Sequence, residues 1–200
     1  VQGLDKWIGS ELNDAACAYL KDFGAATASN GAVGLYHIEN LTPEAVEMGE
    51  KLICEGAKEY IIDDAELKRV QDNYTVMWKK VDATPKLCFV GCPHLSLEQL
   101  KEWTLNVEKE LKAKGSKKVT IPTVFTAAPK VLDAFNKTEF AERLKATGVI
   151  TSYICPLMYM NNPLCKKMPV ITSSNKLRTY TSARYYTDAE ILTIITGGKK

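Results

Sequence analysis

The chain has 200 residues, of which 46% are hydrophobic and 25% are charged, and its formal net charge is +2. Because the charges are spread along the sequence instead of forming basic blocks, we expect no nucleic-acid partner. No apolar run is long enough to span a bilayer, and the first ten residues lack the basic start and apolar middle of a secretory signal. We therefore expect a cytoplasmic protein with no membrane partner.

Six cysteines, at positions 17, 54, 88, 92, 155 and 165, are too sparse in a chain of this size to suggest a disulfide framework. We expect reduced thiols. The sequence starts at Val1 without an initiator methionine, which favours a processed or partial form of a longer protein.

The first third of the chain alternates short apolar runs with amphipathic stretches. Thr42 and Pro43 predict a helix start, because they combine an N-cap residue with proline at the first helical position. The apolar positions that follow predict a helix face made of Val46, Gly49, Ile53 and Ala57. The expected elements are buried strands at 31–38 and 58–63 and helices from 43 and from 64.

The rest of the chain repeats this pattern more clearly. Ser96 and Gln99 form a predicted capping box for a helix over 97–114, and Pro122 within 119–127 indicates an edge strand or a bulge. Helical sequence follows at 129–148. Further strands are expected at 86–91, 149–154 and 169–174. Repeated strand–helix units predict an α/β fold, a single region over residues 1–200 with a mostly parallel sheet and helices on both faces.

Reactive residues follow three of the predicted strands, at Gly91-Cys92-Pro93-His94, at Cys155-Pro156 and at residues 172–176. In a parallel sheet the carboxyl ends of the strands are where ligands bind. These three strand ends are therefore the candidate site.

The cysteines allow different interpretations. Cys88 lies inside an apolar run and is expected to pack in the core, as are Cys17 and Cys54 in helical patterns.

Cys92 lies between Gly91 and Pro93, which predicts a turn ahead of a helix, where backbone amides favour a thiolate. Cys92 and Cys155 are either ligands facing one pocket or unrelated loop cysteines, and a redox pair of Cys88 and Cys92 is a weaker possibility. Cys165 is next to two lysines, whose charges favour a lowered pKa of its thiol. An exposed loop position without a role is the alternative for this residue.

Other polar residues near these strand ends have open roles. His94 is a general acid or base, or a hydrogen-bonded structural residue. The stretch from Ser174 through Lys176 to Tyr180 is suited to holding a carboxylate or phosphate, and is equally consistent with a capped helix start. Gly-rich nucleotide motifs and a serine-hydrolase elbow are absent from the sequence.

The segment "FVGCPHLSLEQL" (89–100) resembles a signature of the large subunit of aconitase X enzymes. "GAATASNGAVGLYHIENLTPEA" (24–45), "IPTVFTAAPKVL", "GVITSYIC" and "VITSSNKLRTY" resemble further segments of that family, in the same order. The resemblance extends over most of the chain and implies an aconitase-like α/β fold, in the carboxyl-terminal half of a longer large subunit.

This resemblance implies an iron–sulfur hydro-lyase that dehydrates a small anionic hydroxy acid, such as cis-3-hydroxy-L-proline or mevalonate 5-phosphate. Cys92 and Cys155 match two of three cluster ligands, and the third is expected outside this chain. The resemblance also implies catalytic roles for Ser174 and Lys176, substrate-binding roles for His94, Ser96 and Tyr180, and a small swivelling subunit or fused domain as partner. The alternative is a non-catalytic α/β domain that serves in binding or assembly.

Overall fold

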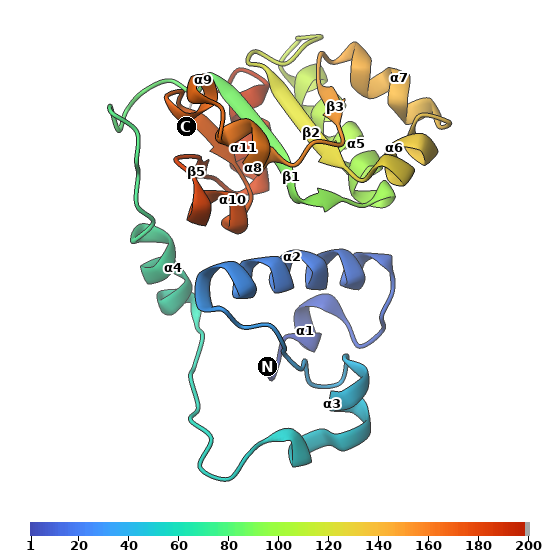
Figure 1. Cartoon of the computed structure of the whole chain (residues 1–200). Coiled ribbons are helices and arrows are strands. Elements are labelled where there is room, and N and C mark those ends of the chain that lie inside the picture. Colours follow the sequence, from blue (N-terminus) through green and yellow to red (C-terminus); the bar gives the residue numbers. More distant parts are fainter. Residues whose placement is uncertain (199–200) are drawn as a thin grey trace.

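A computed structural model of the chain describes residues 1–198. Its centre is a five-stranded parallel sheet with strand order β3-β2-β1-β4-β5, which confirms the predicted α/β fold (Figure 1). The strands are β1 (Leu87–Leu95), β2 (Thr123–Ala127), β3 (Ile150–Ser152), β4 (Val170–Thr172) and β5 (Arg184–Tyr185).

Helices cover both faces of this sheet. The first face packs against α5 (Leu97–Ala113), α6 (Pro129–Phe135), α7 (Glu139–Ala146) and α11 (Asp188–Ile195). The second face packs against α8 (Pro156–Met160) and α10 (Asn175–Tyr180), with α9 (Pro163–Lys166) following α8. Successive residues of β1 divide between the two cores, because Cys88 and Val90 belong to the first and Phe89 to the second.

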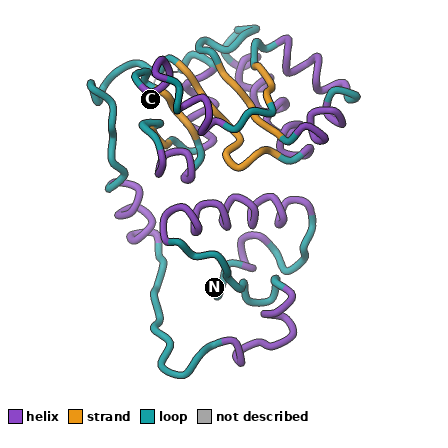
Figure 2. Tube along the Cα trace, viewed as in Figure 1, coloured by secondary structure: helices purple, strands orange, loops and turns teal. Residues whose placement is uncertain are grey.

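The first 72 residues contain only helices and connecting segments (Figure 2). They form α1 (Asp5–Ile8), α2 (Asp14–Gly31), α3 (Pro43–Met48), the 3₁₀ helix η1 (Gly49–Leu52) and α4 (Asp64–Asp72). The long helix α2 lies against α10 and the end of β1, so it borders the carboxyl edge of the sheet. Among residues 1–198, no helix is both long and apolar enough to cross a membrane.

The local signals in the second half of the sequence are confirmed. Ser96 accepts a hydrogen bond from the Gln99 amide (3.1 Å), and the Gln99 side chain accepts one from the Ser96 amide (3.0 Å), which completes the capping box of α5. The strands predicted near 86–91, 149–154 and 169–174 are present as β1, β3 and β4. The very short strand β5 was not predicted.

Several predictions in the first half are wrong. Residues 31–38 and 58–63 form no strand, because no neighbouring strand pairs with them in the part of the chain that is described. The expected helix face after Pro43 does not exist either, since α3 ends at Met48 and Val46 and Ile53 are exposed. Cys17 and Cys54 are exposed instead of buried.

The prediction of an edge strand at 119–127 is also wrong. β2 lies between β1 and β3, and Pro122 immediately precedes it. The proline is tolerated beside an interior strand because only its carbonyl is used, accepting a hydrogen bond from the Cys88 amide (2.9 Å).

Candidate active site

The carboxyl end of β1 is irregular. Its pairing with β2 shifts between Val90 and Leu95, and the Cys92–Pro93 peptide bond is cis. Gly91 has a φ of +106°, and a Cβ atom at this position would collide with the backbone carbonyl of Thr126 on β2. Glycine is therefore required here, so that β1 approaches β2 closely just before Cys92.

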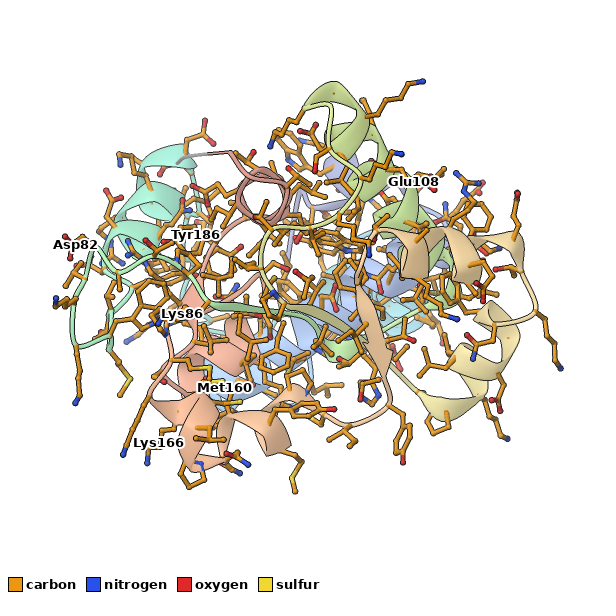
Figure 3. The ribbon with its side chains drawn as sticks, turned by 90° about the horizontal axis from the view of Figure 1, so that it is seen from above. Asp82, Lys86, Glu108, Met160, Lys166 and Tyr186 are labelled. Carbon is orange, nitrogen blue, oxygen red and sulfur yellow. The ribbon has the colours of Figure 1, made fainter. Side chains whose placement is uncertain are left out.

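The prediction that Cys92 lies in a turn ahead of a helix is wrong. The strand continues through Pro93 to Leu95, and α5 begins only at Leu97. Cys92 is instead buried, with 5% of its surface exposed, in the apolar cluster between the sheet and helices α8 and α10. Met160, labelled in Figure 3, belongs to the same cluster.

The fold brings Cys155 to Cys92. Cys155 is the N-cap residue of α8, three residues beyond the end of β3, and it packs against the cluster that contains Cys92. The two thiols are close enough to interact by a side-chain hydrogen bond. Cys165 packs against the same cluster, but the described residues contain no group of three His, Cys, Asp or Glu side chains able to hold a metal ion.

Ser174 connects β4 to the Cys92 segment. It is buried and caps α10, where its hydroxyl accepts a hydrogen bond from the Leu177 amide (2.9 Å). The same hydroxyl donates a hydrogen bond to the Cys92 carbonyl oxygen and is near enough to the Cys92 thiol to act on its pKa. Strand β1, which contains Cys92, and strand β4, which ends two residues before Ser174, are neighbours, and β1 pairs with β2 on its other side. Ligands of open α/β sheets bind at such a switch point.

Burial controls the ionisation of Cys92. It raises the pKa of the thiol to about 11, and the neighbouring Cys155 acts in the same direction. The nearby hydroxyl of Ser174 and the positive charge of Lys176 oppose this shift. The thiol is therefore protonated at neutral pH, and binding of a metal to its sulfur would release the proton.

The other predicted site residues are less closely grouped. Lys176 is near enough to Cys92 to act on its pKa, whereas Tyr180 ends α10 and is 59% exposed. The Nε2 atom of His94 is buried, and no residue within 1–198 forms a hydrogen bond with it. Desolvation and the nearby positive charge of Lys21 lower the pKa of His94.

Ser96 lies beside a separate cavity of about 330 Å³ between α2 and the start of α5. Lys21 also lines this cavity. The sequence analysis did not single out Lys21, because this residue is far from the strand ends in sequence and nothing in the sequence indicates that α2 borders them. The cavity is not lined by Cys92, Cys155, Ser174 or Lys176.

Family models account for most of the chain. Residues 8–72 match the aconitase X second domain, and residues 85–194 match the aconitase X third domain.

Two similar curated proteins are phosphomevalonate dehydratase large subunits. The one from Thermococcus kodakarensis is 34% identical over 62% of this chain and 30% of its own length, and the one from Methanosarcina mazei is 37% identical over 42% of this chain and 18% of its own. The chain thus spans less than a third of either relative. The fold also resembles the crystal structure of Thermococcus kodakaraensis aconitase X in its holo-form, with a TM-score of 0.63 and 23% identity over 90% of this chain and 44% of that one.

Proposed function

The chain belongs to the aconitase X family, and from this we propose that it forms part of the catalytic large subunit of a dehydratase. One observation carries the proposal. Cys92 lies in β1 and Cys155 follows β3, more than sixty residues later in the sequence, yet their thiols lie together at the carboxyl edge of the sheet. This arrangement is expected if both thiols act on one bound group.

We propose that Cys92 and Cys155 hold an iron–sulfur cluster whose third cysteine ligand comes from outside this chain. Two thiols in contact are a suitable donor set, because soft thiolate ligands bind such clusters. The lack of a third suitable ligand in the described part of the chain is consistent with an external one. When bound, a cluster with three protein ligands supplies a Lewis acid for the departure of a hydroxyl group.

The chain's own residues have two roles in this proposal. Ser174 fixes the position of Cys92 through its hydrogen bond to the Cys92 carbonyl oxygen and is a candidate catalytic hydroxyl at the same edge. Lys176, the second residue of α10, supplies positive charge for the anionic end of the substrate and for the transition state. His94, Ser96 and Tyr180 are proposed to extend the binding surface.

The proposed substrate is a small anionic hydroxy acid. The names of the curated relatives favour mevalonate 5-phosphate over cis-3-hydroxy-L-proline. Because those relatives are named large subunits, we also propose a small subunit as partner, and a cytoplasmic location for the assembly.

Anaerobic reconstitution with iron and sulfide tests the proposal. The chain is mixed with the rest of an aconitase X large subunit, and visible absorbance and bound iron are measured. We expect Cys92→Ser and Cys155→Ser each to abolish iron binding, whereas the control Cys88→Ala retains it, because Cys88 is fully buried on the other face of the sheet. Equal iron loss in all three variants, or none in any, would contradict the assignment.

A non-catalytic binding or assembly domain is the second candidate. The described residues lack a complete ligand set, which is the observation in its favour. A reconstituted complex that binds no iron would support this candidate.

A further inference from the structure

Two segments with strand-like sequences lie exposed outside the sheet. In the first, Val33 and Leu35 are 44% and 74% exposed. In the second, Tyr60, Ile61 and Ile62 are 69%, 74% and 64% exposed. Figures 1 and 2 show the second segment as an extended trace between η1 and α4, at the outer side of the molecule. These are the same segments for which the sequence wrongly predicts buried strands.

The backbone of the second segment lacks partners as well. No backbone hydrogen bond joins residues 58–62 to any other described residue. Unpaired amides and carbonyls on an extended chain are a template for pairing with another strand. Side chains alternate along such a chain, so exposure of three consecutive large apolar residues means that both of its sides lack cover.

The relatives indicate what is available to cover this surface. The part of this chain that matches the Thermococcus kodakarensis large subunit covers 30% of that protein, so most of it lies outside the match. Apolar residues on both sides of an extended segment are typical of a strand inside a parallel sheet, covered by helices on each face. A surface of this kind therefore fits folded polypeptide of the same subunit better than a polar or charged ligand.

We propose that residues 58–63 are a docking surface for the part of an aconitase X large subunit that lies outside the match with this chain. The missing part adds at least one strand along residues 58–63 and covers Tyr60, Ile61 and Ile62. This inference rests on the proposed function, because the same missing part would bring the third cluster ligand.

The test combines assembly with hydrogen exchange. This chain is co-expressed with the part of the Thermococcus kodakarensis large subunit that it does not match. As a positive control, the same part of the Thermococcus protein is co-expressed with the Thermococcus segment that this chain matches. Assembly of these two pieces shows that the partner is folded. We expect co-elution and at least tenfold slower amide exchange at residues 58–62 in the complex than in the chain alone.

A pair of matched variants locates the surface. Ile61→Lys is expected to lower the yield of complex at least tenfold, whereas Leu164→Lys leaves it unchanged, because Leu164 is equally exposed (72%) but belongs to α9. Full assembly of the Ile61→Lys variant would overturn the inference. Concentration-dependent protection of residues 58–62 in the chain alone would also overturn it, by showing that a second copy uses the surface.

Failure of this inference can be distinguished from failure of the proposed function. A complex that protects residues 58–62 but never binds iron supports the docking surface and contradicts the cluster. A complex that binds iron through Cys92 and leaves residues 58–62 unprotected supports the cluster and contradicts the docking surface.

Discussion

Individual residues determine the position and the chemistry of the proposed site. Gly91 allows the β1 backbone to approach β2, and Ser174 holds the residue after Gly91, Cys92, by a hydrogen bond to its carbonyl oxygen. Thr126 completes the contact by donating a hydrogen bond to the Gly91 carbonyl oxygen (2.5 Å). Because each of these groups has little freedom, small substitutions here are expected to have large effects.

Gly91→Ala is predicted to reduce the free energy of unfolding by about 2–5 kcal/mol, since the new methyl group must displace the β2 backbone and φ is positive. Gly115→Ala is the control, because Gly115 also has a positive φ but has open space around it. Its expected cost is about 1 kcal/mol. Urea denaturation measures both, and equal losses would show that the collision with Thr126 is unimportant.

Because the pKa of the Cys92 thiol is raised, we predict that the stability of the fold depends on pH in the alkaline range. Its folded-state pKa of about 11 lies above the usual value of 9.0, so between these values the unfolded chain releases a proton that the folded chain keeps. The free energy of unfolding should therefore fall as pH rises through this window, by on the order of 2 kcal/mol from this group. Urea denaturation under reducing conditions, compared with Cys92→Ala, isolates the contribution. A constant difference between the two proteins from pH 8 to 11 would refute the prediction.

At the scale of elements, helix α10 is fixed from outside the sheet. The Arg178 guanidinium stacks on the Tyr74 ring at 3.8 Å and donates a hydrogen bond to the Asn30 side chain of α2 (2.9 Å). Thr179 donates to the same Asn30 oxygen (2.7 Å). These contacts hold the helix that carries Lys176 against α2.

Arg178→Ala is predicted to cost about 1–3 kcal/mol of stability, through loss of the cation–π contact and of the hydrogen bonds to Asn30 and Asn175. Arg178→Lys should recover only part of this, because lysine lacks the planar group that stacks and donates. Thermal denaturation of both variants provides the measurement. Full recovery by lysine would mean that charge alone holds α10.

The elements also show how far the sequence predicts the fold. The capping box of α5 was correct to the residue, because Ser96 and Gln99 interact within one turn. Residues 58–63 have the composition of a strand, but a strand also requires a partner, and this cannot be seen locally. β5 has only two residues, too few for any periodicity to be visible.

The candidate site, like the fold, could be predicted from the sequence only in part. Cys92 and Cys155 were found by their positions after apolar runs and by family resemblance. Their proximity depends on the order of the strands, which a single sequence does not determine. The roles assigned to Cys92 and Cys155 stay predictions, as do those of Ser174, Lys176, His94, Ser96 and Tyr180.

At the scale of the whole molecule, burial is very uneven. Residues 1–72 contribute only Ala16, Ile38, Leu41 and Thr42 to the buried set, whereas all other buried residues lie between Trp78 and Thr196. Since local stability follows buried apolar contacts, the segment between α3 and α4 should open far more readily than the sheet.

Limited trypsin digestion tests this difference. We expect the first cuts after Lys51 and Lys58, which are exposed and lie in or beside the extended segment, before any cut within residues 87–195. Mass spectrometry of the early fragments identifies the sites. Early cleavage after Lys130 in α6 would show that the sheet region is no more stable than the rest.

The charges around the extended segment have a consequence for solubility in the cell. Tyr60-Ile61-Ile62 is the kind of short apolar stretch that promotes aggregation, and it is preceded by Lys58 and Glu59 and followed by Asp63 and Asp64. In-register stacking of identical copies would place like charges side by side on both flanks, which is unfavourable. The flanking charges therefore act as gatekeepers, which discourage self-association while leaving the apolar stretch open to a different strand.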